Sequence, residues 1–349
     1  MIKSLQTWRL LFALVIFLHH FPVDGAGLFK AGGPLGVSFF MMLSGLVMSA
    51  GYERKVLSDD FSYKNFLLKR LLRLWPLHLL CLAMFVLLHL SSVFASWRSI
   101  GTLGLNALML QSWVPVRSVY FSGNAVSWCL CDLMFCYALF PWLCRLLQRL
   151  TRKTMTLGVL SVLLLYFVIV ALLPQPMVHP LVYISPLFRM LDFLWGMLLY
   201  RISEFCLARL KLKQQRCSCA WLSLAEMAAV ALVVLAAACY GLVPWSLRLA
   251  AWWWLPVAAL LLVFRLSEGL GGGLLTWLLS CNGLVTLSSC SFTFYMIHQL
   301  ALGPLLAWFN HVGLNLPLSL MIGFSALLIY LLALLLNRYF ERPLSRIIP

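Results

Sequence analysis

The sequence has 349 residues, of which 63% are hydrophobic and only 10% are charged, and its formal net charge is +16. Soluble globular domains are about 45–50% apolar and about 25% charged, so this composition excludes a water-soluble fold and indicates a membrane protein. A bilayer core about 30 Å thick takes roughly 20 apolar residues per helix, so the expected spans can be located along the chain.

Ten apolar runs have the length and composition of a membrane span. They lie near residues 6–22, 34–50, 71–91, 125–144, 155–173, 187–203, 218–240, 247–265, 289–308 and 317–337. A weaker run at 100–114 is short and interrupted by glycine and asparagine, so we expect it to lie at the surface or to re-enter the membrane. The sequence therefore predicts an all-α polytopic membrane protein of about ten transmembrane helices, with residues 1–349 forming one domain.

The basic residues are distributed unevenly between the two sets of loops. If the N-terminus is cytoplasmic, the outer loops contain only Lys30, Arg98, Arg117 and Arg248, and the other loop cations lie inside. This is the positive-inside pattern, and it places both termini in the cytoplasm. The net charge therefore reflects topology and is not a footprint for nucleic acid.

The first span, WRLLFALVIFLHHF, contains ionisable residues that lipid disfavours. Arg9 and His20 are separated by ten residues and share one helix face, whereas His19 points about 80° away. Such residues inside a membrane face the protein interior or a water-filled cavity. The alternative is that Arg9 extends to the headgroups and His20 rests at the outer interface.

Two arginines mark the beginning of the third span, in KRLLRLWP at residues 69–76. Arg70 and Arg73 are three residues apart and therefore share a helix face. Paired guanidinium groups suit phosphate oxygens. Ordinary positive-inside anchoring explains their charge equally well, but it does not explain the shared face.

Five further polar residues lie at membrane depth: Asp132, Arg189, Asp192, Tyr295 and His298. Arg189 and Asp192 are three residues apart, so they can form an ion pair with each other near the outer surface. His298 is three residues after Tyr295, and a lone histidine in a span can also serve as a hydrogen-bonded packing residue. The sequence contains no metal-ligand cluster and no Walker loop.

These segments, taken in order, resemble the integral-membrane acyltransferase family 3. The matching segments cover nearly the whole chain: Arg9 with His20, GVSFFMMLSGLVMS at 36–49, Arg70 with Arg73, Trp128 to Pro141, Arg189 to Gly196, Ser291 to His298, and Glu341 to Pro343. One position departs from the family pattern. Many members have a glutamate five residues after the tryptophan, and this chain has Leu133 there. Asp132 just precedes it, but it lies about 100° away on a helix and need not replace that carboxylate.

The resemblance implies transfer of an acyl group, acetyl first of all, from cytoplasmic acyl-CoA to a hydroxyl of a cell-surface or lipid-linked glycan. It also implies a location in the bacterial inner membrane. His20 would then act as a general base or acyl carrier, since an imidazole has a pKa of about 6.5. Arg9 would orient that ring or stabilise charge on the thioester oxygen, and Arg70 with Arg73 would hold the CoA phosphates. No metal is expected.

Two other classes of function remain open on the sequence alone. A secondary transporter or a flippase for a lipid-linked sugar would also need about ten helices with buried charge. Such proteins commonly contain internal repeats, and this sequence shows none. A scaffold without activity would leave Arg9, His20 and the Arg70–Arg73 pair without a role.

Overall fold

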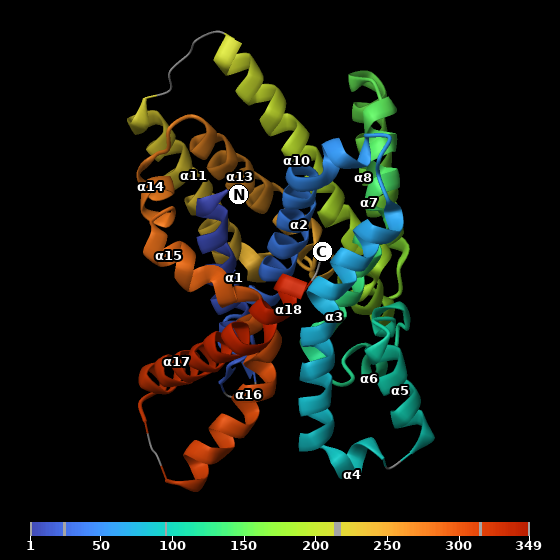
Figure 1. Ribbon diagram of the computed structural model, residues 1–349, viewed down its shortest axis with the longest axis vertical. Coiled ribbons are helices and arrows are strands. Elements are labelled where there is room, and N and C mark those ends of the chain that lie inside the picture. Colours follow the sequence, from blue (N-terminus) through green and yellow to red (C-terminus); the bar gives the residue numbers. More distant parts are fainter. Residues whose placement is uncertain (1, 24–25, 95, 213–217, 314–315, 348–349) are drawn as a thin grey trace.

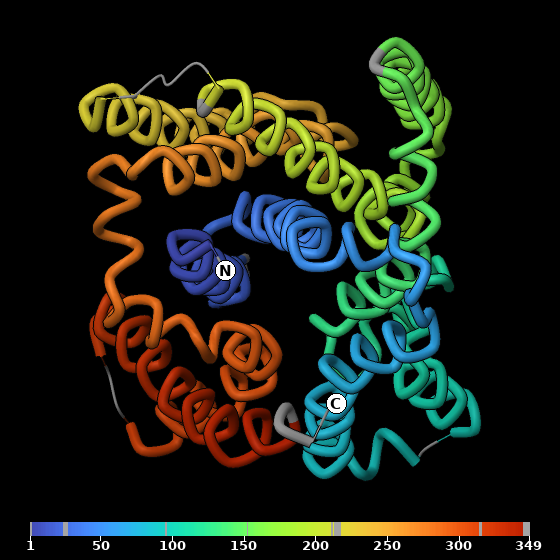
Figure 2. Tube along the Cα trace, turned by 45° about the horizontal axis from the view of Figure 1, so that its top comes forward, coloured from blue at the N-terminus to red at the C-terminus, as the bar shows by residue number. Residues whose placement is uncertain are grey.

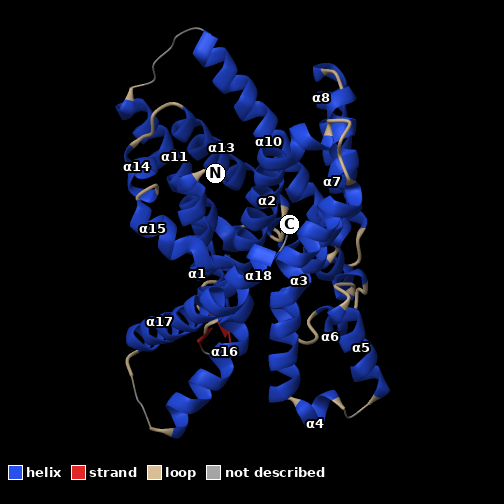
Figure 3. Cartoon of the chain, viewed as in Figure 1, coloured by secondary structure: helices blue, strands red, loops and turns tan. Residues whose placement is uncertain are grey.

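The computed structural model describes residues 2–23, 26–94, 96–212, 218–313 and 316–347. Over these ranges the regular elements are helices joined by loops, apart from one hairpin of two-residue strands, β1 (Pro22–Val23) and β2 (Ala26–Gly27) (Figure 3). The long helices are α1 (Lys3–His20), α2 (Gly32–Val56), α3 (Tyr63–Leu88), α7 (Trp128–Arg149), α8 (Arg152–Leu172), α10 (Pro186–Leu212), α11 (Cys219–Ala238), α13 (Ala251–Gly269), α16 (Ser291–His311) and α17 (Leu318–Leu336).

Short elements connect the long helices. They are α4 (Leu90–Val93), α5 (Trp97–Ala107), η1 (Gln111–Trp113), α6 (Arg117–Tyr120), η2 (Ala125–Ser127), α9 (Gln175–Val178), η3 (His179–Ile184), η4 (Cys239–Leu242), α12 (Trp245–Arg248), α14 (Leu274–Leu279), α15 (Asn282–Leu287), η5 (Ser288–Cys290), η6 (Asn337–Glu341) and α18 (Arg342–Ile347). Each of the ten predicted apolar runs coincides with one long helix, and Figure 1 shows how they are arranged.

Within the described ranges, eight helices are long and apolar enough to cross a membrane, and a bent pair makes a ninth if it is one span. That pair joins 175–184 to α10 with a bend of 44°. The remaining expected span, α1, falls outside this set because its polar residues lower its hydropathy. The prediction of a polytopic all-α membrane protein is therefore confirmed.

The polar first helix lies inside the bundle. Figure 2 shows α1 and α2 surrounded by the later helices. In the most apolar window of α2, 67% of the residues are buried, against 11% in α8 and 17% in both α11 and α17. Lipid cannot solvate ionisable groups, so a helix with ionisable residues along its span lies in the interior, while the more apolar helices face the acyl chains.

Helices α2 and α10 cross at close range through two glycines. A methyl group on Gly45 would lie 2.0 Å from the carbonyl oxygen of Phe193, and one on Gly196 would lie 1.9 Å from that of Met42. Only glycine permits this approach, which is the usual way that membrane helices pack tightly. The glycines therefore hold α2 and α10 together beside α1.

The segment after α3 turns back into the protein. Helix α5 has 11 residues and is too short to span a bilayer, as the sequence predicts. Its last carbonyls are held by α3, because Trp75 Nε1 donates to Ala107 O at 2.8 Å and His78 Nε2 lies 2.8 Å from Asn106 O. These bonds satisfy the helix end and bring the loop that follows toward the bundle.

A carboxylate fixes the start of α1. Glu268, at the end of α13, accepts hydrogen bonds from the backbone nitrogens of Lys3 and Ser4 at 2.8 and 3.2 Å, and from the Ser4 hydroxyl at 2.8 Å. A negative group at a helix N-terminus satisfies free N–H groups and complements the helix dipole. This cap sets the position of α1 along its axis, and with it the depth of Arg9 and His20.

Candidate functional site

Two cavities lie on either side of Tyr295, which lines both of them. The inner cavity has a volume of about 180 Å³ and is lined by Arg9, Ser44, Arg70, Arg73, Tyr137 and Tyr295, among others. The outer cavity has a volume of about 490 Å³ and is lined by His19, His20, Arg117, His179, Tyr183 and Gln299, among others. The names follow the orientation that the positive-inside rule predicts.

His20, the last residue of α1, lines the outer cavity and contacts a second imidazole that is fully buried behind it. Its Nδ1 lies 3.0 Å from Nε2 of His298 and 3.1 Å from the carbonyl oxygen of Ile16. The other ring nitrogen of His298, Nδ1, lies 2.6 Å from the carbonyl oxygen of Tyr295. The sequence predicts both histidines as candidate site residues. The structure brings them into direct contact, although they are 278 positions apart in the chain.

This chain of bonds assigns the ring protons when both imidazoles are neutral. His298 must carry its proton on Nδ1, because a carbonyl oxygen only accepts. His298 Nε2 is then an acceptor, and His20 donates to it from Nδ1. The lone pair of His20 is left on Nε2, which makes no hydrogen bond within the described residues. That is the state in which a histidine can remove a proton.

His19 is held differently, although it also lines the outer cavity. Its Nδ1 lies 3.1 Å from the carbonyl oxygen of Phe29. Its Nε2 is packed against the backbone of α2, since a methyl group on Gly33 would lie 2.7 Å from that nitrogen. The two adjacent histidines are therefore not equivalent, because His19 is bonded to the segment before α2 and His20 is bonded to His298.

Arg9 does not reach the imidazole. It lines the inner cavity, and the eleven-residue rise from Arg9 to His20 along α1 is about 16 Å. The expectation that Arg9 orients the His20 ring is therefore wrong, because His298 occupies that position. Arg9 makes no hydrogen bond or ion pair within the described part of the chain, so its guanidinium is available to a ligand in the inner cavity.

Arg70 and Arg73 both line the inner cavity, as their shared helix face predicts. Arg70 donates to the hydroxyl of Tyr52 at 2.6 Å. Arg73 lies 3.0 Å from Glu341 and keeps a side chain that is 44% exposed. Together with Arg9, three guanidinium groups line the inner cavity, and Glu341 is the one carboxylate that contacts them here. The cavity therefore favours an anionic ligand.

Two hydrogen bonds hold the Glu341 carboxylate in position. It accepts from Asn337 Nδ2 at 2.9 Å and from the hydroxyl of Thr293 at 2.5 Å. The sequence identified Glu341 only as part of a closing motif. Its pairing with Arg73 joins residues 268 positions apart and depends on how α3 packs against the end of α17, which no local pattern encodes.

Asp132 lies away from both cavities. It is fully buried, and its Oδ1 accepts from the hydroxyl of Ser112 at 2.7 Å. The bond ties the segment after α5 to α7. This placement agrees with the one-residue offset from the family's glutamate.

Arg189 and Asp192 form a separate buried cluster. Their ion pair measures 2.7 Å, and neither side chain is more than 1% exposed, so the pair that the spacing predicts is buried within the protein. Asp192 also accepts from Trp254 Nε1 at 2.5 Å, and Arg189 donates to the carbonyl oxygens of Val182 and Leu249 at 2.8 and 3.2 Å. These bonds join α10 to α13 and η3, and neither residue lines either cavity.

Two outer-cavity residues have no signal in the sequence motifs. Arg117 is the first residue of the four-residue α6, and His179 begins η3. Both occur in connecting segments, where helical periodicity gives no information. The uneven loop charge is the one pattern that draws attention to Arg117, since few cations are expected outside.

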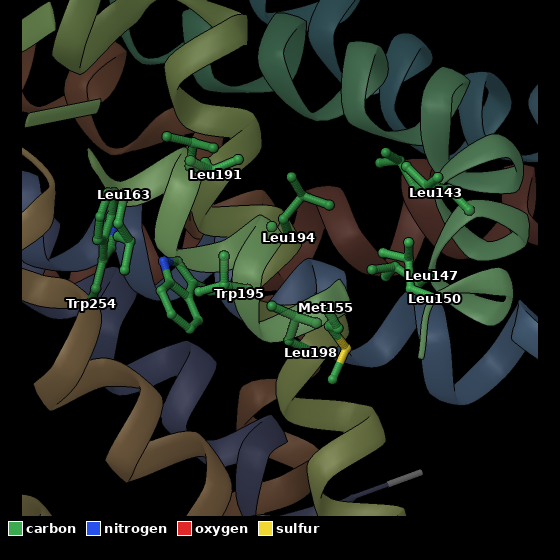
Figure 4. Close-up of a pocket in the computed structure, with 14 residues that line it drawn as sticks. Leu143, Leu147, Leu150, Met155, Leu163, Leu191, Leu194, Trp195, Leu198 and Trp254 are labelled. Atoms are coloured by element: carbon green, nitrogen blue, oxygen red, sulfur yellow. The ribbon is translucent and has the colours of Figure 1, made fainter. Parts of the chain in front are cut away.

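A third cavity, of about 230 Å³, lies between α7, α8 and α10 (Figure 4). Its lining is formed by leucine, valine, methionine and tryptophan side chains and one glycine, for example Leu147, Leu194 and Trp195. It contains no group able to transfer a proton or bind a phosphate. It is therefore no candidate for the site of acyl transfer. Over the described residues, no cluster of three or more His, Cys, Asp or Glu side chains can hold a metal ion.

Comparison with known families agrees with this arrangement. The family model for the acyltransferase domain, acyltransferase family 3, matches residues 2–338. No curated protein and no solved structure matches the chain. The match spans both cavities and nearly every helix, and it decides between an acyltransferase and a transporter or scaffold. The chain belongs to the acyltransferase 3 family, and it is an acyltransferase that acts on hydroxyl groups.

Proposed function

We propose that this protein transfers an acetyl group from cytoplasmic acetyl-CoA to a hydroxyl of a cell-surface or lipid-linked glycan, in the bacterial cytoplasmic membrane. The observation that carries the proposal is the pair of cavities that meet at Tyr295. One cavity presents three guanidinium groups, and the other presents an imidazole with a free Nε2. A donor with phosphates and an acceptor with a hydroxyl fit these two sides.

The inner cavity binds the acyl donor in this proposal. Arg70 and Arg73 hold the CoA phosphates at the cytoplasmic end, and the Arg73 fork is aligned by Glu341. Arg9 binds the donor deeper in the cavity. The pantetheine arm then extends past Tyr295 and brings the thioester to the outer cavity. Arg9 is thus a donor-binding residue and not the partner of the imidazole.

The outer cavity carries out the transfer. His20 Nε2 removes the proton of the acceptor hydroxyl, and the oxygen attacks the thioester carbonyl carbon. The tetrahedral adduct collapses with cleavage of the carbon–sulfur bond. His20 returns its proton to the departing sulfur, so the products are the glycan ester and CoA. The bond from His20 Nδ1 to His298 keeps the reacting nitrogen unprotonated at the start.

The test compares the adjacent histidines in purified protein. CoA release and acyl transfer are measured in proteoliposomes for wild type, His20→Ala and His19→Ala. We expect His20→Ala to abolish transfer while His19→Ala keeps most of it, because His20, unlike His19, is oriented by a bond to His298. Equal activity of the two variants refutes the role of His20. Mass spectrometry of surface glycans from cells with and without the protein identifies the acyl group by its mass increment, which for an acetyl ester is C2H2O.

A further inference from the structure

The outer cavity has one permanent cation and no acidic group on its described lining. Arg117 and three imidazoles, those of His19, His20 and His179, line it, and no Asp or Glu is among its described lining residues. Neutral sugars are commonly held by hydrogen bonds and aromatic faces, and a cavity for them has no need of an unpaired cation. The charge of this lining favours an anionic ligand.

Arg117 has no structural partner that explains its position. It makes no ion pair within the described chain, and the positive-inside rule disfavours cations on the outer side. Arg248, another outer cation, differs because its guanidinium lies 4.8 Å from the ring centre of Tyr240 and 5.2 Å from that of Trp245. Arg117 is therefore a cation placed at the cavity and left without a neighbour of opposite charge.

His179 is held beside Arg117 by aromatic contacts. Its ring stacks on Trp245 at a centroid distance of 6.2 Å and an interplanar angle of 12°, and Arg248 lies over the same tryptophan. Its Nδ1 lies 3.2 Å from the hydroxyl of Tyr120. The ring is thus held in one orientation, and its Nε2 makes no hydrogen bond within the described residues. A fixed imidazole next to a free guanidinium suits a carboxylate or a phosphate.

We propose that the acceptor carries an anionic group, which Arg117 and His179 bind while the hydroxyl to be acylated lies at His20 Nε2. The inference rests on the proposed function and narrows the acceptor from glycans in general to acidic ones. A uronic acid carboxylate and a sugar phosphate share the required chemistry. The aromatic rings of Trp128 and Tyr183, which also line the cavity, offer faces for the sugar ring.

The experiment measures binding without any acyl donor. Methyl glucuronide, glucose 6-phosphate and methyl glucoside are titrated against the full protein in nanodiscs, and tryptophan fluorescence reports binding. The variants are Arg117→Gln and His179→Gln. Arg98→Gln is the matched control, since Arg98 is exposed on the outer side and does not line the cavity. Unfolding temperatures check that each variant is folded.

We expect the acidic probes to bind about tenfold or more tightly than methyl glucoside, because each charge-assisted bond is among the strong hydrogen bonds. Arg117→Gln should remove most of this preference, and Arg98→Gln should leave it intact. The stronger of the two acidic probes identifies the group as carboxylate or phosphate. Equal binding of acidic and neutral probes, or a preference that survives Arg117→Gln, overturns the inference.

A parallel assay of CoA release separates this inference from the proposed function. CoA release that depends on His20, without any preference for acidic probes, means that the function stands and the acidic acceptor is wrong. Binding of acidic probes that depends on Arg117, without CoA release under any condition, means that the anion site stands and the proposed function is wrong.

Discussion

Replacement of His298 by phenylalanine tests the two-imidazole arrangement most directly. The change keeps an aromatic ring in a fully buried position beside Phe294, but it removes the acceptor for His20 Nδ1. The ring of His20 then loses one of the two bonds that orient it. Only the Ile16 carbonyl then favours the proton on Nδ1, so a proton on Nε2 is less disfavoured, and an imidazole with its proton on Nε2 cannot use that nitrogen as a base.

The size of the effect follows from the bond that is lost. A hydrogen bond between neutral groups contributes about 0.5–1.5 kcal/mol, which corresponds to about 2-fold to about 13-fold in rate. We therefore expect kcat to fall by up to about tenfold. The KM for acyl-CoA should not change, because Arg70 and Arg73 lie in the inner cavity, on the other side of Tyr295.

The assay is initial rate against acyl-CoA concentration in proteoliposomes that contain equal amounts of folded protein. His298→Gln should recover part of kcat, because an amide oxygen can accept from His20 Nδ1. His311→Phe is the matched control, since this histidine is exposed at the end of the same helix. A kcat equal to that of wild type in His298→Phe, or a change confined to KM, refutes the positioning role.

Three further predictions concern the donor site, the buried ion pair and the topology. Lysine at both Arg70 and Arg73 keeps the charge but loses the forked geometry, so the KM for acyl-CoA should rise by about tenfold with little change in kcat. An unchanged KM means that both residues only anchor the helix at the membrane surface. Arg189→Met leaves a carboxylate buried without its partner and should lower the free energy of unfolding by about 3–5 kcal/mol, seen as a lower melting temperature in detergent. An unchanged melting temperature contradicts a stabilising role for the bonds that join α10 to α13. Reporter fusions at Arg149 should read cytoplasmic and those at Lys30 external; an external signal at Arg149 means that an odd number of spans precedes it.

Variants of similar chemistry provide the controls. For the lysine pair, Arg145→Lys changes an exposed arginine on the same side of the protein, outside the inner cavity, and should leave the KM for acyl-CoA unchanged. For the ion pair, the double variant Arg189→Met with Asp192→Leu removes both charges and should be more stable than Arg189→Met alone. This comparison separates loss of the pair from loss of packing volume.

The helices were predictable because lipid gives a strong and simple signal. A run of about 20 apolar residues is unambiguous, and each of the ten runs became a helix. The same solvent makes ionisable residues conspicuous, which is why Arg9, His20, Arg70 and Arg73 could be selected before their contacts were known. The short helices α14 and α15 carry no comparable signal, since neither is long enough to show a period.

Contacts between distant segments were not predictable. A helix face places Arg9 and His20 on one side of α1, but it does not say that a tyrosine from α16 lies between the cavities they line. Likewise, an arginine and an aspartate three residues apart predict an ion pair, but only the crossing of α10 and α13 decides that Arg189 and Asp192 are fully buried. Helical periodicity determines which residues face the interior of the protein. The packing of the helices determines which residues they contact there.

The division at Tyr295 addresses a difficulty that any transfer across a membrane must meet. A path open to water from one side of the membrane to the other would conduct protons. Here the Tyr295 hydroxyl is fixed to the carbonyl oxygen of Val126 at 2.9 Å, and its ring borders both cavities. The cations that attract the donor and the imidazole that activates the acceptor therefore lie in separate compartments. Because Arg9 and His20 belong to one rigid helix whose start is capped by Glu268, the spacing between the two compartments is set by the fold itself.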